Sequence, residues 1–442
     1  MSLFSLSGVH LKHHKNTAKK TPERMPVPTS VTIPMQMHIG APAVPCVTVG
    51  DEVRVGQKIA EAGAGLSSPI YSGVSGKVKK IDEITASTGA KMSAVVIACD
   101  GAQTLAESVV LPVVSDRESF LSAVRESGIV GLGGAGFPTA VKLNVPAGRV
   151  DTVVVNGAEC EPYITSDTRT MLDESELVAE GLSLVMKYLE IPNAIFGIEK
   201  NKPECIAAMK QATERMAGVS IRALPSVYPQ GGEKVLVYHT TGRVIGEGKL
   251  PLDAGVIVVN CTTLATIAKY LRTGMPLVEK CVTVDGSAVK EPKNLIVPIG
   301  ASVRDVIAAC GGFSEMPKKI LSGGPMMGVA LVDLDAVVLK QTNAILAFGK
   351  KDAESPKETA CIRCGKCLDT CPFGLSPVDI AKAFEQGDDE ALEKLKVNLC
   401  MECGCCSYVC PAKRNLVQMN RLAKGRLRAY GQKKKEEATR DK

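Results

Sequence analysis

Two runs of cysteine near the end of this 442-residue sequence carry its clearest chemical signal. Each run reads Cys-x-x-Cys-x-x-Cys-x-x-x-Cys-Pro, which is the spacing of bacterial ferredoxins that hold [4Fe–4S] clusters. Zinc sites pair two short Cys-x-x-Cys units and need neither the third cysteine nor the final Cys-Pro. The sequence therefore predicts two [4Fe–4S] clusters in preference to two zinc ions.

The first three cysteines of a run and its fourth cysteine are expected to bind different clusters. Three closely spaced thiolates can surround one cube from a tight loop, whose N–H groups stabilise the anionic cluster. The fourth cysteine lies too far round and reaches the other cluster. The predicted ligands of cluster one are Cys361, Cys364, Cys367 and Cys410. The predicted ligands of cluster two are Cys400, Cys403, Cys406 and Cys371.

The other cysteines are not expected to bind metal. Cys405 lies inside the second run but out of register, and seven more are scattered and interpreted as small buried hydrophobes. The first 20 residues contain no apolar segment typical of a signal peptide. In a chain without an export signal, 16 cysteines favour metal ligation over disulfides.

A glycine-rich loop is the second candidate site. Gly131, Gly133, Gly134 and Gly136 match the pattern G-x-G-x-x-G. A Rossmann site needs a strand before this pattern and a helix after it, whereas here a helix-like segment precedes it and Pro146 soon ends any helix that follows. A loop whose N–H groups face a phosphate or a flavin ring is the favoured interpretation, and a simple tight turn is the alternative.

Composition predicts a globular protein of several domains. Hydrophobic residues make up 45% and charged residues 23% of the chain, which excludes general disorder. A prior of roughly 150 residues per domain suggests about three domains. No apolar run approaches the roughly 18 residues of a membrane span, so we expect a cytosolic chain that docks, if at all, on a membrane partner.

Positive charge is concentrated at the two ends of the chain. Residues 413–442 hold 11 lysine and arginine residues against 3 acidic ones, and residues 1–30 hold 5 against 1. No helix-turn-helix or aromatic-rich element accompanies these tails, so the charge does not predict nucleic-acid binding. We interpret the tails as solvated, with docking of the basic segment 412–430 on membrane subunits as the alternative.

Short Val/Ile runs alternating with glycine make the first third of the chain β-rich. Residues 50–59 and 68–74 resemble the biotinyl/lipoyl hammerhead fold, in which a lysine at a hairpin tip carries the cofactor. Residues 62–68 contain no lysine. The resemblance therefore implies the scaffold and not the carrier function.

Strands and helices alternate in the middle of the chain, which predicts an α/β domain with a largely parallel sheet. The expected strands are 152–155, 194–198, 221–224 and 256–259. The expected helices are 116–128, 175–188, 203–216 and 263–271. Residues 276–345 are strand-rich with a short helix at 303–309, two short helices at 378–397 separate the cysteine runs, and 412–430 has helical spacing.

The glycine loop, residues 131–139 with Lys142, resembles the flavin- and NADH-binding loop of the NADH-oxidising flavoprotein subunit of respiratory complex I. Further segments resemble that family in chain order. They are Asn156–Pro162, Tyr228–Glu233, Val259–Ala265 and, in a following β-grasp domain, Ser322–Gly328. The double ferredoxin run, the hammerhead and the segment His38–Pro42 resemble instead the C subunits of Rnf complexes, the membrane-bound ion-translocating ferredoxin:NAD⁺ oxidoreductases.

The resemblance implies noncovalently bound FMN with NADH over its ring. It implies that the backbone of the four loop glycines lines FMN and the nucleotide, that Lys142 offers a cation to FMN, and that Phe137 presents an aromatic face. Polar contacts to FMN are implied for Asn156, Asn260 and Thr263. The resemblance implies that Glu159, Glu161 and Glu233 shape the nicotinamide side and accept ribose hydroxyls, and that Gly231 also belongs to the cofactor-binding residues. No catalytic acid, base or nucleophile is expected, since positioning and tuning of potentials suffice.

We therefore expect a multidomain α/β and β protein. Its expected parts are an extended basic arm (1–30), a hammerhead or barrel-sandwich domain (31–112), an α/β FMN/NADH-binding domain (113–275), a β-grasp domain (276–350), a double [4Fe–4S] ferredoxin-like helical domain (351–411) and a basic C-terminal helix and tail (412–442).

The expected function is electron transfer between NADH, FMN and two clusters. The resemblance implies an oxidoreductase subunit that is peripheral on the cytoplasmic face of the membrane and passes electrons to membrane subunits, to an iron–sulfur partner and indirectly to ferredoxin. A corrinoid reductase of similar architecture and a non-enzymatic iron–sulfur relay scaffold are the alternatives.

Overall fold

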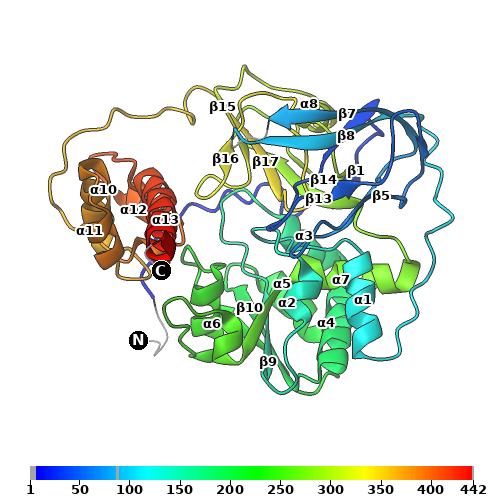
Figure 1. Cartoon of the computed structure of the whole chain (residues 1–442), viewed down its shortest axis with the longest axis horizontal. Coiled ribbons are helices and arrows are strands. Elements are labelled where there is room, and N and C mark those ends of the chain that lie inside the picture. Colours follow the sequence, from blue (N-terminus) through cyan, green and yellow to red (C-terminus); the bar gives the residue numbers. More distant parts are fainter. Residues whose placement is uncertain (1–5, 86–88, 441–442) are drawn as a thin grey trace.

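The computed structural model describes residues 6–85 and 89–440, which form four packed units tied together by the N-terminal arm (Figure 1). The mixed α/β unit lies at the bottom of this view, the two β-rich units lie above it, and the helical unit with the cysteine runs stands to one side. A charged linker after residue 350 leads to the helical unit.

The first unit is a β-sandwich, as the Val/Ile and glycine pattern predicts. One sheet has the order β2-β8-β7-β4 and the other the order β3-β5-β6. The strands are β2 (Ser30–Pro34), β3 (Val44–Pro45), β4 (Glu52–Val53), β5 (Lys58–Glu61), β6 (Ile70–Tyr71), β7 (Gly76–Thr85) and β8 (Lys91–Cys99). Alternate residues such as Val31 and Ile33 are buried between the sheets, because successive side chains of a strand point to opposite faces.

The α/β unit contains a four-stranded parallel sheet of order β11-β10-β9-β12. The strands are β9 (Thr152–Asn156), β10 (Asn193–Glu199), β11 (Val219–Leu224) and β12 (Val256–Asn260). The helices are α1 (Arg117–Glu126), α2 (Thr139–Leu143), α3 (Ser166–Asp173), α4 (Ser175–Leu189), α5 (Pro203–Ala212), α6 (Glu233–Thr241) and α7 (Cys261–Thr273). All four expected strands are confirmed, whereas α2, α3 and α6 were not expected.

The third unit is a six-stranded mixed sheet of order β1-β14-β13-β17-β15-β16, covered by α8. Its elements are β1 (Glu23–Arg24), β13 (Glu279–Asp285), β14 (Lys293–Pro298), α8 (Val303–Ala309), β15 (Lys319–Ser322), β16 (Val329–Ala330) and β17 (Ala344–Phe348). The helix has the predicted bounds and is capped by Ser302, whose side chain accepts from Asp305 N. The strand β1 comes from the N-terminal arm and pairs in parallel with β14.

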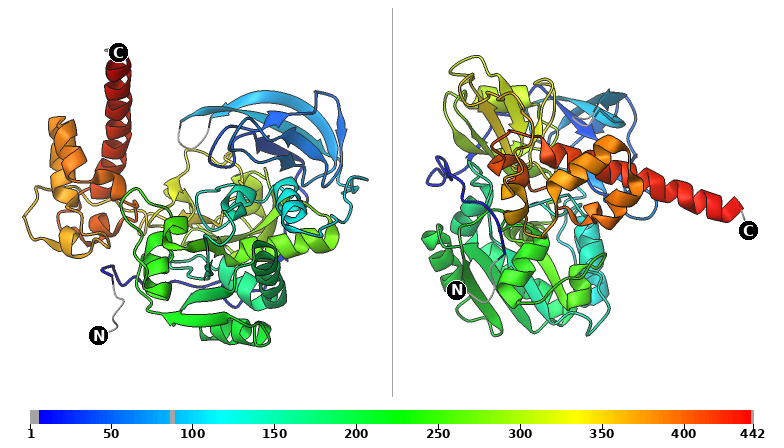
Figure 2. Two further views of the ribbon diagram at one scale, coloured as in Figure 1. Left: turned by 60° about the horizontal axis from the view of Figure 1, so that its bottom comes forward. Right: turned by 90° about the vertical axis from the view of Figure 1, so that its left-hand side faces the viewer.

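The helical unit holds both cysteine runs. Its helices are α9 (Lys366–Asp369), α10 (Pro377–Gln386), α11 (Asp389–Lys394), α12 (Cys405–Val409) and α13 (Leu416–Arg440). The two helices expected between the runs are confirmed as α10 and α11. The basic helix begins at Leu416 and continues to Arg440, ten residues beyond the expected end, and its far half projects from the molecule (Figure 2).

The N-terminal arm lies against all the units that follow the sandwich, so its interpretation as a solvated tail is wrong. Val9 pairs with Tyr228, and Gly8 O accepts from Thr370 Oγ1 of the helical unit. The side chain of Lys15 is only 16% exposed and donates to the carbonyl oxygens of Glu159 (2.8 Å) and Glu161 (2.9 Å). The sequence did not predict these contacts, because neither the charge nor the prolines of the arm indicate that Lys15 packs against the α/β unit.

Candidate functional site

The glycine loop lies at the carboxyl ends of the two strands where the order of the parallel sheet reverses. From β9 the chain proceeds outward to β10 and β11, and then returns to place β12 on the other side of β9. Asn156 and Asn260 end these two strands and are aligned in register. Open α/β sheets bind ligands at the strand ends beside such a reversal.

The loop is anchored on both sides while its middle stays open. Leu132 N donates to Thr263 Oγ1 (3.1 Å), and Leu132 O accepts from the buried Lys280 Nζ (2.6 Å). The loop is closed at its base by Gly131 N, which donates to Phe137 O (2.8 Å). Gly133 and Gly134 are exposed. The middle of the loop is therefore accessible beside the strand ends.

Two of the loop glycines are needed for space or for backbone conformation. A Cβ at Gly133 would collide with the amide of Asn260, whose Cγ would lie 2.8 Å away. Gly136 has φ +70°, and a Cβ there would approach Met37 O at 3.3 Å. Gly136 O also accepts from Ile39 N (3.2 Å) of the β-sandwich. The β-sandwich unit therefore supports the glycine loop through the segment that includes His38.

Polar side chains predicted for the site lie together near these strand ends. Lys142 on α2 lies 3.0 Å from Glu233 Oε1 and donates to Val258 O (3.1 Å). Asn156 Nδ2 donates to Gly231 O (3.0 Å), which fixes the turn before α6. The structure thus brings together the glycine loop, Lys142, Asn156, Gly231, Glu233, Asn260 and Thr263.

Phe137 is half-buried at the base of the loop. Its role as an aromatic face for a ligand stays a prediction, because the partial burial is compatible with both packing and stacking.

Glu159 and Glu161 already bind groups of the protein. Glu159 is buried and accepts from Asp167 N (2.8 Å) and Thr168 Oγ1 (2.7 Å) at the start of α3. Glu161 accepts from the backbone N–H groups of Met326 (3.0 Å) and Met327 (2.8 Å) in the third unit. Their contact with ribose hydroxyls stays a prediction, and it requires these oxygens to accept further hydrogen bonds or to exchange partners.

Asp167 is a site residue that sequence reasoning missed. Its carboxylate accepts from Asn260 Nδ2 (2.8 Å) and Thr262 Oγ1 (2.7 Å). Asn260 Oδ1 in turn caps α7 by accepting from Thr262 N and Thr263 N. The amide of Asn260 is therefore held from both sides. No spacing pattern links position 167 to position 260, so only the fold reveals the pair.

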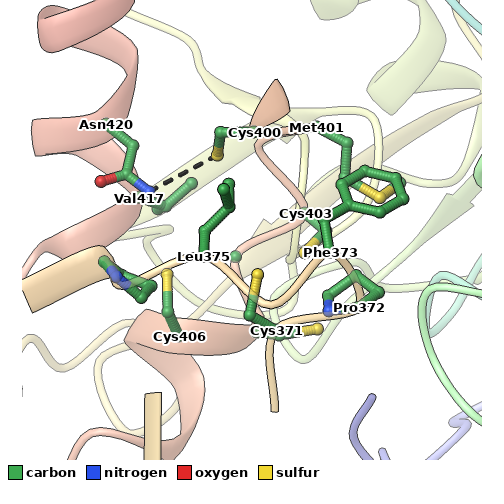
Figure 3. Close-up of a pocket in the computed structure, with 13 residues that line it drawn as sticks. Cys371, Pro372, Phe373, Leu375, Cys400, Met401, Cys403, Cys406, Val417 and Asn420 are labelled. Atoms are coloured by element: carbon green, nitrogen blue, oxygen red, sulfur yellow. Dashed lines mark hydrogen bonds between the residues drawn. The ribbon is translucent and has the colours of Figure 1, made fainter. Parts of the chain in front are cut away.

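One small cavity of about 20 Å³ is lined by the first three cysteines of the second run and by the fourth cysteine of the first run (Figure 3). Cys371, Cys400, Cys403 and Cys406 surround it, together with the apolar side chains of Phe373, Leu375 and Val417. Cys405 lines it too, and its Sγ lies 3.9 Å from Tyr228 O. The structure thus brings together the four residues that crossed ligation predicts for cluster two.

The cysteines predicted for cluster one also lie close together. Burial raises the pKa of Cys367, and the thiols of Cys410, Cys361 and Cys364 raise it further. Cys361 and Cys364 are exposed. The two cysteine loops adopt the same conformation, since Arg363 and Glu402 have φ of +56° and +61°, and each donates its N–H to the cysteine two residues earlier (3.4 Å).

The donor set around the predicted cluster two fits an iron–sulfur cluster. Among the residues that the structure describes, no three metal-binding side chains converge on one ion position. A [4Fe–4S] cube needs no such convergence, because each of its four thiolates binds a different iron at a separate corner. Four thiols around an apolar cavity, with loop N–H groups on their sulfurs, therefore fit this group.

The second cysteine loop packs directly on the α/β unit. Tyr228 OH donates to Cys403 O (2.8 Å), and a Cβ at Gly232 would collide with Met401. A Cβ at Gly404 would lie 2.9 Å from Met326 O of the third unit. The predicted cluster two therefore lies next to the turn that precedes α6, whereas the predicted cluster one faces outward.

Family models match four consecutive parts of the chain. They are described as the RnfC barrel sandwich hybrid domain (residues 4–102), the Nuo51 FMN-binding domain (124–269), the SLBB domain (281–330) and the 4Fe-4S dicluster domain (355–411). The models therefore give a barrel-sandwich, an FMN-binding, an SLBB and a 4Fe–4S domain in this order.

Curated relatives match the chain over nearly its full length. The C subunit of the proton-translocating ferredoxin:NAD(+) oxidoreductase complex of Clostridium ljungdahlii is 45% identical over 97% of this chain and 95% of its own length. The C subunit of the Na(+)-translocating ferredoxin:NAD(+) oxidoreductase complex of Acetobacterium woodii is 41% identical over 96% and 97%. A chain of an NAD+-reducing [NiFe]-hydrogenase shares the fold, with 18% identity, a TM-score of 0.50 and coverage of 69% of this chain and 61% of its own.

Proposed function

The chain belongs to the C subunits of ion-translocating ferredoxin:NAD(+) oxidoreductase complexes, and on that premise we propose that it exchanges electrons between NAD(H), FMN and two [4Fe–4S] clusters. The observation that carries the proposal is the packing of a four-cysteine site directly against the domain that holds the glycine loop. FMN, when bound, supplies hydride exchange with a nicotinamide and single-electron exchange with iron–sulfur centres.

The region at the carboxyl ends of β9 and β12 is the proposed flavin and nucleotide site. The open N–H groups around Gly133 and Gly134 are placed to bind phosphate or ring oxygens. Lys142 supplies a cation whose charge is shared with the half-exposed Glu233. Asn260 and Thr263 contact the loop from the start of α7, so the site is preformed. The proposed reaction needs no acid or base from the protein.

Arrangement of the cysteine sites supports an order of electron transfer. The cysteines assigned to cluster two lie beside Tyr228 and Gly232, on the same side of the α/β unit as Glu233. Those assigned to cluster one include the exposed Cys361 and Cys364. We assign electron exchange with the flavin site to cluster two. We assign electron exchange with partner proteins to cluster one.

The proposed setting is the cytoplasmic face of the membrane. No helix among the described residues is long and apolar enough to cross a bilayer. The relatives are named as subunits of ion-translocating complexes, so we propose that membrane subunits and an iron–sulfur subunit are the electron partners and that ferredoxin is reached through them.

The mixed sheet with α8 is assigned to the β-grasp type.

An anaerobic NADH titration of the purified chain with reconstituted clusters tests this proposal. We expect the flavin absorbance to bleach first and an iron–sulfur EPR signal to appear next. A Cys364→Ser chain is the matched control, because it should keep the bleaching and lose transfer to an external acceptor. A cluster signal obtained with dithionite but not with NADH would refute the nucleotide site and favour the relay scaffold. Corrinoid reduction by the isolated chain would favour the corrinoid reductase.

A further inference from the structure

The two cysteine loops and the helices that follow them are structural repeats with an offset of 39 residues. Cys361 corresponds to Cys400 and Cys371 to Cys410, and α10 and α13 begin at the corresponding residues Pro377 and Leu416. The two loops also share a left-handed residue after their first cysteine. Each position around one predicted cluster can therefore be compared with its equivalent around the other.

One buried position differs between the repeats in its capacity to donate a hydrogen bond. Asn420 on α13 is 1% exposed and its Nδ2 lies 3.4 Å from Cys400 Sγ (Figure 3). The corresponding residue on α10 is Ala381, which is also 1% exposed and has no polar side-chain atom. Only the second repeat can therefore supply a side-chain N–H to a cysteine sulfur from this position.

The second polar atom of Asn420 is buried and has no partner. Asn420 Oδ1 makes no hydrogen bond. A buried amide oxygen without a donor is costly, and such an atom in a folded protein needs an explanation. An iron-bound cysteine sulfur carries no proton and only accepts, so an amide beside it must present its N–H₂ group and turn its oxygen elsewhere. The observed orientation of Asn420 is the one that a cluster-bound Cys400 requires.

Burial makes such a donor useful at this site. Cys403 and Cys406 are each 8% exposed, whereas Cys361 and Cys364 are exposed. A reduced cluster carries one more negative charge than an oxidised one, so exclusion of water lowers its reduction potential, and hydrogen bonds to its sulfurs raise it. Cluster two is the buried site, and it is the site that has the amide.

Charged side chains also lie close to the two cysteine loops. Glu402 is paired with Arg421 (3.2 Å) and with Lys424 (2.6 Å), which also donates to Cys400 O (2.9 Å). In the first repeat Arg363 is exposed, so solvent screens its charge. Lys424 therefore reaches a main-chain oxygen of Cys400, whereas Asn420 is the side chain whose N–H reaches the sulfur of Cys400.

We propose that Asn420 is a positioning residue that raises the reduction potential of cluster two through its hydrogen bond to Cys400 and so offsets the burial of that cluster. This inference rests on the proposed assignment of cluster two. Its consequence is that the two clusters stay close enough in potential for electrons to pass in both directions.

EPR-monitored redox titration of the full chain with both clusters reconstituted tests the inference. We expect Asn420→Ala to lower the midpoint of one cluster signal by about 59 mV, which is a tenfold change in the one-electron equilibrium, and to leave the other signal unchanged. Asn420→Leu fills the same space without a donor and should give the same shift. Gln418→Ala, an exposed position on the same helix, is the control and should shift neither signal.

Unchanged midpoints in both Asn420 variants, or an equal shift of both signals, would overturn the inference. If Asn420→Ala fails to assemble one cluster, Asn420→Leu decides the matter through the same measurement. The titration uses dithionite and mediators, so it does not depend on NADH. Failure of NADH to reduce the chain would refute the proposed function, whereas a selective shift in the Asn420 variants would still support the inference.

Discussion

A methyl group added at Gly133 should disrupt the candidate flavin site and the start of α7 together. The new Cβ would lie 2.8 Å from Cγ and 3.1 Å from Cβ of Asn260. Displacement of that side chain would break its hydrogen bonds, because Oδ1 caps α7 and Nδ2 binds Asp167. Loss of an N-cap costs about 1 kcal/mol, and loss of a hydrogen bond to a buried carboxylate costs about 1.5–3 kcal/mol.

Gly133→Ala should therefore lower the free energy of unfolding by about 2.5–4 kcal/mol. A domain of this size shifts its melting temperature by about 2–4 °C per kcal/mol, so melting should occur roughly 5–16 °C lower. The assay is thermal unfolding of the flavin-free chain, followed by the flavin content of the purified protein. Gly134→Ala is the matched control, since a Cβ there meets nothing within 4 Å. Equal melting temperatures for the two variants would refute the reasoning.

Three further predictions concern other parts of the chain. Burial lowers the pKa of Lys340 to about 7 from 10.5. Above pH 7 the unfolded chain therefore binds more protons at this lysine than the folded chain does. The free energy of unfolding should rise by about 2 kcal/mol between pH 7 and 9. Denaturant titrations should show a smaller rise for Lys340→Met, and an identical rise would contradict this origin. Tyr228→Phe removes the hydrogen bond to Cys403 O and should slow flavin-to-cluster transfer in stopped-flow traces without changing NADH bleaching. Lys142→Ala should reduce flavin retention on gel filtration, and full retention would exclude a role for its cation.

The elements that follow a strict pattern could be predicted from the sequence, whereas those defined by distant contacts could not. Strands β9 and β12 are continuous apolar runs, and α8 has a serine cap and a short apolar stripe, so local rules suffice. The helix α3 is different, because all residues from Ser166 to Met171 are buried although most of them are polar. Its start is stabilised by Glu159, which lies seven residues or more before the groups it binds.

The candidate site likewise has residues that the sequence predicts and residues that it does not. Cysteine spacing predicts the sets that the structure brings together, because short loops determine which sulfurs lie close to one another. Asp167, Lys15 and Asn420 could not be predicted, because each acts through a partner that is far away in sequence or has an ordinary residue type. Asn420 and Cys400 are 20 residues apart, and although Asn420 shares a helical stripe with Leu416, Ala423 and Leu427, that spacing does not show which group it binds.

Placement of the N-terminal arm has a consequence for the order in which the chain folds. The arm leaves the ribosome before every segment that it contacts, and Thr370, the residue that binds Gly8, is 362 positions later. Its strand β1 must likewise wait for β14, which lies some 270 residues further on. Contacts of such long sequence separation form late, because closing a long loop costs entropy before any contact repays it.

Folding of the separate units therefore precedes their locking together. Lys15 can bind the carbonyl oxygens of Glu159 and Glu161 only after the α/β unit has formed, and Gly8 can meet Thr370 only after the helical unit has formed. The arm therefore docks last during biosynthesis. It docks only after the units that hold the glycine loop and the cysteines have reached their native arrangement.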